Sequence, residues 1–271
     1  MKTKRGTMNF KQPVLNLTPS NNKSQVTIFI ILAIVLIFVI AIILYNQGQF
    51  TNIFKTQTPL EQIAECSQEH LQEAITLIST QGGATNPTNY FLSQDNKVDY
   101  ICYTNENNRP CKMQKPVLKT SIENELEKYT TPKIKQCIES TKTTLEKKGK
   151  TITHQNPEIS IELLPNNAII TIDLNLQIKD SESTQSYKSI NTDVNTMLYD
   201  FIAITSEIAN DEVEFGDTET INYMLTNQPW LQLEKKKQSE GTKIYTLTDR
   251  ESDPSFIFAT RSLVISTGGV N

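Results

Sequence analysis

The chain has 271 residues, of which 21% are charged and 37% are hydrophobic, so its composition is that of a globular protein. Its net charge of −4 is unevenly distributed. The first 25 residues carry five positive charges and no acid, so the rest of the chain carries −9. An acidic domain is a poor match for a phosphate backbone, and this charge argues against nucleic acid as a partner.

Residues 26–45 read VTIFIILAIVLIFVIAIILY and contain no charge, proline or glycine. As a helix they would be about 30 Å long, which matches the hydrocarbon core of a bilayer. Tyr45-Asn46-Gln47 follows, without the small residues of a signal-peptidase site. The basic residues precede the segment, so the positive-inside rule places the N-terminus in the cytoplasm. The sequence therefore predicts a single-pass protein of the cell membrane that contacts lipid through residues 26–45, with its C-terminal domain outside.

All four cysteines lie in the part of the chain that is predicted to be outside: Cys66, Cys102, Cys111 and Cys137. An even number of cysteines in an oxidising compartment indicates two disulfides. Three pairings are possible. Cys102–Cys111 and Cys66–Cys137 are favoured, because the first pair brackets a turn-rich stretch and the second joins two predicted helices.

A zinc site is the competing interpretation of the cysteines. The sequence contains no C-x-x-C motif. Its only histidines are His70 and His154, both in polar surroundings that predict a surface position. No nucleophile elbow, P-loop or H-E-x-x-H motif is present, and the acidic run 207–219 lacks the spacing of a calcium loop and predicts a solvated loop. The sequence therefore predicts no enzyme, no cofactor and no metal site.

The outer domain is predicted to begin with a helix that follows a polar linker at residues 46–58. Thr58, Pro59 and Glu61 form a capping box with proline at the first helical position, and Gly82-Gly83 ends the helix.

A second helical region is expected from a capping box at Thr120 and Glu123. Pro132 is expected to interrupt this region, and a third helical segment follows it as far as the lysine-rich stretch 147–150.

The apolar pattern then changes to every second residue between Ile159 and Ile178, around a turn at Pro165-Asn166-Asn167, which predicts an antiparallel hairpin with one buried face. From Ile190 and Val194 onward, the apolar residues recur at helical spacing, which predicts a further helix. Short strands are expected near the end of the chain, at 230–234, 243–248 and 255–261.

These elements predict an α+β fold in which one N-terminal transmembrane helix is followed by an extracytoplasmic domain of helices packed on antiparallel sheet. The predicted regions are a basic cytoplasmic N-terminus, the membrane helix, the linker, a helical cysteine-containing subdomain and a sheet-and-helix subdomain: 1–25, 26–45, 46–58, 59–150 and 151–271. The last two could equally form one core.

The junction Lys23-Ser24-Gln25-Val26-Thr27-Ile28-Phe29 resembles the class III signal peptide of archaeal type IV pilin-like proteins. The resemblance implies a processing site at Lys23, Ser24 and Gln25, with cleavage after Ser24. The family often has serine at the third mature position and glutamate at the fifth, where this chain has Thr27 and Phe29. The layout is also similar to N-terminally anchored archaeal surface proteins with an uncharacterised ectodomain.

Two functions are therefore expected. The first is a single-pass surface protein whose disulfide-stapled ectodomain binds or scaffolds another molecule at the cell envelope. The alternative is a pilin-like subunit that is cleaved after Ser24 and assembles through its apolar helix. Gly48 and Pro59 flank the polar linker, which favours a tether over a continuous pilin helix. Other envelope proteins, or further copies of the chain, are the expected partners.

Overall fold

The computed structural model describes residues 22–46, 58–226, 230–249 and 254–264. The chain divides into two units, Met1–Thr56 and Gln57–Asn271, and each is considered by itself. Most of the linker predicted at 46–58 lies outside the described residues.

The first unit contains helix α1, Asn22–Asn46, which includes residues 26–45. Among the described residues, no helix is both long and apolar enough to cross a membrane. The prediction of a transmembrane helix at 26–45 is therefore wrong on this finding. A span needs about 20 consecutive apolar residues in one helix, and no described helix combines that length with sufficient hydropathy.

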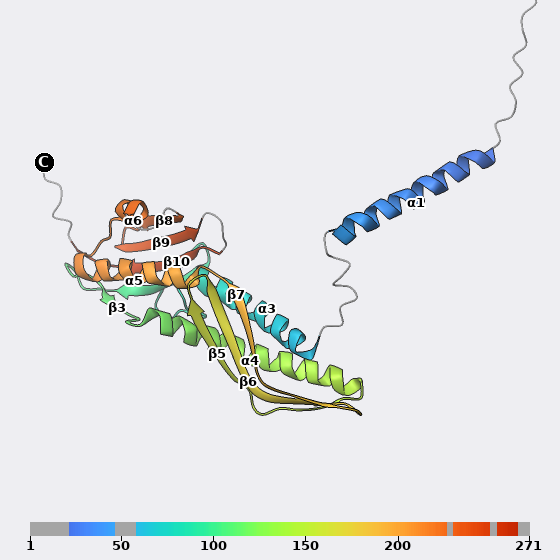
Figure 1. Cartoon of the computed structure of the whole chain (residues 1–271). Coiled ribbons are helices and arrows are strands. Elements are labelled where there is room, and N and C mark those ends of the chain that lie inside the picture. The colour runs from blue at the N-terminus through green and yellow to red at the C-terminus, as the bar shows by residue number, and fades with distance from the viewer. Residues whose placement is uncertain (1–21, 47–57, 227–229, 250–253, 265–271) are drawn as a thin grey trace, which may run out of the picture. The chain divides into compact units, whose positions relative to one another are not determined.

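Two long helices organise the second unit, α3 (Pro59–Thr80) and α4 (Leu118–Lys147), which lie side by side in Figure 1. They run antiparallel, because Cys66 is bonded to Cys137 whereas Glu73, further along α3, contacts Lys133, which comes earlier in α4.

The capping box predicted at the start of α3 is confirmed. The backbone N–H of Glu61 donates to Thr58 Oγ1 (3.2 Å), and the backbone N–H of Thr58 donates to the Glu61 carboxylate (2.8 Å). At the other end, the N–H of Gly83 donates to the carbonyl of Ile78 (2.8 Å). Gly83 has a φ of +78°, and a Cβ there would lie 2.6 Å from Ile122 Cδ1, so the turn out of α3 requires glycine.

The start of α4 differs from the prediction. No side chain caps the helix, which begins at Leu118, and the capping box expected at Thr120 and Glu123 does not form. Glu123 instead accepts a hydrogen bond from the backbone N–H of Leu163 (2.9 Å) in the neighbouring sheet. A tertiary partner has replaced the local one.

Pro132 lies inside α4 and does not interrupt it, so the expected break is also wrong. An interior proline costs about 3 kcal/mol. Leu126 and Ile134 flank it and are fully buried. Because each such side chain contributes about 1.5–3 kcal/mol, packing offsets the cost of the proline.

One sheet packs on these helices and consists of β4 (Thr151–Thr153), β5 (Glu158–Leu164), β6 (Asn167–Lys179) and β7 (Thr184–Asn195). β6 is central and antiparallel to the others, with β4 and β5 on one side and β7 on the other. Its alternate residues from Ala168 to Ile178 are buried. The hairpin predicted from the two-residue period is thus confirmed.

Ile190 and Val194 belong to β7, opposite Ile172 and Ala168 of β6, and not to a helix as predicted. Residues four apart share a face in a strand as well as in a helix, so this pair alone could not distinguish the two. The helix begins only at Leu198.

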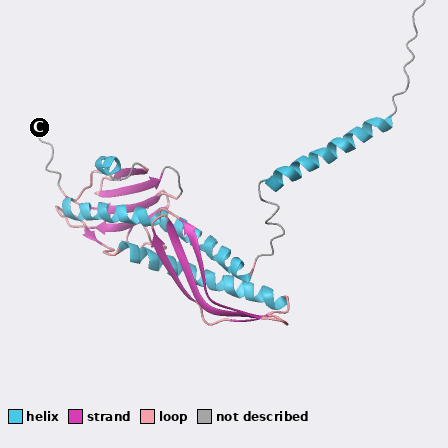
Figure 2. Cartoon of the chain, in the orientation of Figure 1, coloured by secondary structure: helices cyan, strands magenta, loops and turns pink. Residues whose placement is uncertain are grey.

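A second sheet contains β1 (Tyr90–Ser93), β2 (Asn96–Tyr103), β3 (Lys112–Met113), β8 (Leu231–Lys237), β9 (Thr242–Asp249) and β10 (Phe256–Arg261). The strand order is β1-β2-β10-β9-β8, with β3 also beside β2. Only the β2–β10 pair is parallel among these pairings of the described strands. Helices α5 (Leu198–Phe215) and α6 (Thr220–Thr226) complete the unit. Figure 2 shows the mixture of helices and strands that confirms the α+β class.

One cluster of buried apolar side chains joins residues of both predicted subdomains, such as Ile75 of α3 and Ile170 of β6. Residues 57–271 also form a single compact unit. Of the two alternatives, a single core therefore agrees better with the packing.

The two disulfides, Cys66–Cys137 and Cys102–Cys111, close loops of very different length, with sequence separations of 71 and 9 residues. Loop-closure entropy assigns them about 4 and about 3 kcal/mol of stability respectively.

We expect Cys66→Ser/Cys137→Ser to lower the free energy of unfolding in urea more than Cys102→Ser/Cys111→Ser. An equal or reversed order would show that local contacts, and not loop closure, dominate.

Candidate ligand-binding site

A buried carboxylate marks the centre of the candidate site. Glu212 lies in the last turn of α5 and is fully buried. It belongs to the buried face of that helix, one turn beyond Ile208. A buried carboxylate is unfavourable unless cationic or hydrogen-bonding partners surround it.

Three side chains from the second sheet and the segment after it supply those partners. Lys243 of β9 donates to both carboxylate oxygens of Glu212 (3.0 and 2.7 Å), and the hydroxyl of Tyr245 donates to one of them. Ser262 Oγ lies 3.1 Å from the other oxygen. Burial, followed by the nearby charge of Glu212, raises the pKa of Tyr245 far above its usual range, so this hydroxyl keeps its proton.

Gly216 ends α5 in the left-handed region, with a φ of +74°. Its carbonyl accepts a further hydrogen bond from Lys243. A Cβ at this position would lie 2.3 Å from Val264 Cγ2, so the turn that brings this carbonyl to the lysine depends on glycine.

Asp217 extends the network toward solvent. It accepts hydrogen bonds from Lys235 (2.9 Å) and Lys237 (2.6 Å) of β8 and lies 3.6 Å from Lys243. Partial burial raises the pKa of Asp217, but the hydrogen bonds from Lys237 and Lys235 and the charge of Lys243 outweigh it and hold the pKa well below its usual range. The carboxylate is therefore ionised at neutral pH.

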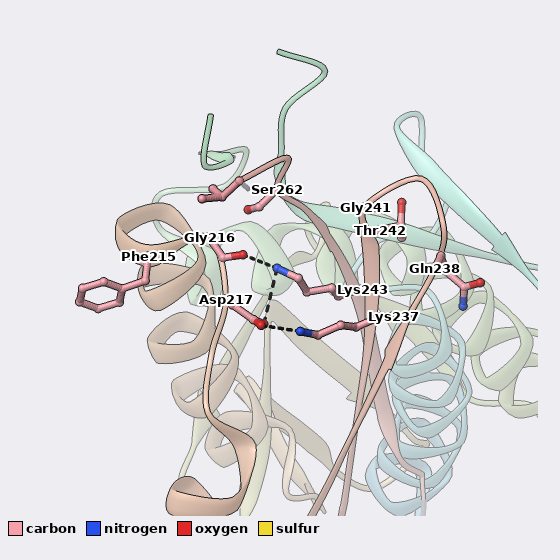
Figure 3. Close-up of a pocket in the computed structure, with 10 residues that line it drawn as sticks. Phe215, Gly216, Asp217, Lys237, Gln238, Gly241, Thr242, Lys243 and Ser262 are labelled. Atoms are coloured by element: carbon pink, nitrogen blue, oxygen red, sulfur yellow. Dashed lines mark hydrogen bonds and ion pairs between the residues drawn. The ribbon is translucent and has the colours of Figure 1, made fainter. Parts of the chain in front are cut away.

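A pocket of about 290 Å³ opens beside this network, between the end of α5, the β8–β9 turn and the segment after β10 (Figure 3). Lys237 and Lys243 project toward Asp217 in Figure 3, whereas the ring of Phe215 points away from them. Polar groups and glycines make up most of the lining, together with two apolar side chains: Phe215, Gly216, Asp217, Lys237, Gln238, Gly241, Thr242, Lys243, Ser262 and Val264.

The charges around the pocket favour an anion. The lining residues include two lysines, Lys237 and Lys243, and one carboxylate, Asp217, so the lining carries one positive charge in excess. The side chain of Lys237 is 58% exposed and can reach a ligand, whereas that of Lys243 is nearly buried. Val264 is also exposed and adds an apolar side chain to the lining, whereas the exposed ring of Phe215 points away from the lysines. The site is suited to binding a small acidic group that is attached to an apolar one.

The Cys102–Cys111 disulfide is connected to this site. The backbone N–H of Cys111 donates to Ser262 Oγ (3.1 Å), and Ser262 contacts Glu212. Both disulfides join the cysteines that the sequence favoured as pairs.

The two histidines singled out from the sequence are not among the residues that line this pocket. His154 contacts Glu139 (3.1 Å). Lys23, Ser24 and Gln25 fall at the start of α1, where side chains are not described. The acidic run 207–219 is not simply a solvated loop, because it contains the buried Glu212.

Glu212 and Lys243 were missed from the sequence, although a signal was present. Glu212 follows Phe201, Thr205 and Ile208 on one helical face, and Lys243 shares a strand face with Tyr245. A charge at a core position of each amphipathic element is the pattern that could have revealed the pair.

Breaking the buried pair is predicted to be costly. Glu212→Gln removes the closer and fully buried of the two carboxylates beside the Lys243 ammonium, and the loss should be about 3–5 kcal/mol in the free energy of unfolding. The double variant Glu212→Leu/Lys243→Met should recover much of this loss, because it removes both charges. Chemical denaturation of the two variants and the wild type checks this. A double variant no more stable than Glu212→Gln would contradict it.

The chain matches no protein-family model, and comparisons with curated proteins and with solved structures found no significant similarity. The residues of the site are therefore the basis for assigning a function.

Proposed function

We propose that residues 58–271 form a disulfide-stabilised binding module that works outside the cytoplasm, where it binds or scaffolds another molecule of the cell envelope. Two disulfides and no free cysteine among the described residues support an oxidising compartment. The proposal rests chiefly on the pocket beside Glu212 and Lys243.

The partner presents a carboxylate next to an apolar side chain. The carboxylate meets Lys237 at the mouth of the pocket, where the excess positive charge lies. The apolar side chain covers Val264, which is 44% exposed. A chain terminus or an acidic side chain of an envelope protein has this chemistry.

Binding of an acetylated Gly-Leu-Ala tripeptide to the full chain tests this proposal by calorimetry. The form with a free carboxylate should bind more tightly than its C-terminal amide, because only the carboxylate pairs with Lys237. Lys237→Gln should weaken binding of the carboxylate form by up to about fivefold, as expected for a pair that is largely exposed to solvent.

The matched control is Lys188→Gln, which removes an exposed lysine of β7 that does not line the pocket. It should leave the affinity unchanged. Equal affinities for the carboxylate and the amide, or equal losses in both variants, would refute the assignment of the pocket.

A second candidate function rests on α1 and makes the chain a pilin-like subunit. The described apolar side chains of this helix, from Phe29 to Ile42, are about half to three-quarters exposed. In this alternative, α1 packs against α1 of neighbouring copies after cleavage at Ser24.

N-terminal sequencing and intact mass of the protein from its native cells distinguish the two functions. Assembly through α1 requires a mature chain that starts at Gln25, whereas a chain that keeps Met1 and its basic leader argues against it. The resemblance of residues 23–29 to a class III signal predicts the processed form if the second function is correct.

A further inference from the structure

The Cys66–Cys137 disulfide has a histidine beside it. His70 follows Cys66 by one turn on α3, and Cys137 comes from α4. The two sulfur atoms and a ring nitrogen of His70 all lie within 4.8 Å of one another. Cys137 is buried and the other two are partly buried.

From this arrangement we infer that Cys66, Cys137 and His70 form a zinc site when the disulfide is reduced. Thiolate and imidazole are the ligands that Zn²⁺ prefers, at about 2.3 Å for sulfur and about 2.0 Å for nitrogen. A tetrahedron with these bonds places its corners about 3.3–3.8 Å apart. The three donors therefore need shifts of only about 1 Å from their present positions.

The chemistry balances with a dithiol as the reductant. The dithiol transfers two electrons and two protons to the S–S bond, which breaks into two thiols, and the dithiol becomes its own disulfide. Zn²⁺ then replaces both thiol protons, which pass to solvent. The two thiolates neutralise the ion, and water completes its coordination opposite the three protein ligands.

His70 contacts the carboxylate of Glu73. Its Nδ1 lies 3.4 Å from Glu73, so the other ring nitrogen is the one available to a metal. Glu73 is itself fixed by hydrogen bonds from Lys133 and Tyr129, each at 2.8 Å. A carboxylate that orients a histidine is the usual outer partner of a zinc ligand.

The disulfide and the zinc site cannot exist at the same time, because both use the sulfur atoms of Cys66 and Cys137. The oxidised pair joins α3 to α4 covalently, and the reduced pair joins them through the metal. Metal binding would also protect the thiols from reoxidation. The inference does not depend on the pocket near Lys243, because its residues come from other elements.

Zinc binding by the full chain tests the inference. The protein is reduced with dithiothreitol, freed of it without oxygen, and titrated with Zn²⁺ against a coloured chelator. The reduced chain should bind one Zn²⁺ at this site and the oxidised chain none. His70→Gln should weaken binding by at least about tenfold, whereas His154→Gln, which removes the chain's other histidine, should not change it.

A second measurement does not rely on variants. In the reduced wild type, Zn²⁺ should slow alkylation at Cys66 and Cys137, read by mass spectrometry, and leave the rates at Cys102 and Cys111 unchanged. Equal protection of all four cysteines, or equal zinc affinity in the two histidine variants, would overturn the site, since cysteines of an unfolded chain would behave in that way.

Discussion

A carboxylate in an apolar interior needs cationic and hydrogen-bonding partners, and the C-terminal half of this domain is arranged around that need. Glu212 is fully buried at the end of α5, and its partners come from β9 and from the segment after β10. The pair with Lys243 joins the end of α5 to the second sheet. The helix ends at Gly216, whose carbonyl accepts a hydrogen bond from the same lysine, and the pocket opens beside this end.

Local patterns in the sequence predicted the elements whose stability is local. The capping box at Thr58 and the alternating hairpin around Pro165-Asn166-Asn167 agree with α3, β5 and β6, because each depends on residues close together in the chain. The three short strands expected near the end of the chain also correspond to β8, β9 and β10.

Predictions failed where a distant partner decided the outcome. Glu123 bonds to Leu163 and not to the start of its own helix, and Ile190 pairs with Ile172 across the sheet. The transmembrane helix failed for another reason, since no described helix meets the length and hydropathy that a span requires. The candidate site was missed because Glu212 and Lys243 are separated by 31 residues, and only their place on two core faces relates them.

The two disulfides contribute to different properties of the molecule. Cys66–Cys137 links two helices that already share extensive apolar packing, so its effect lies mainly in the entropy of the unfolded chain. Cys102–Cys111 closes a short loop and restricts the unfolded chain less, but it positions the Cys111 N–H that holds Ser262 against Glu212. The bridge that contributes less to global stability is therefore the one that bears on the geometry of the pocket, and ligand affinity should depend on Cys102–Cys111 more than on Cys66–Cys137.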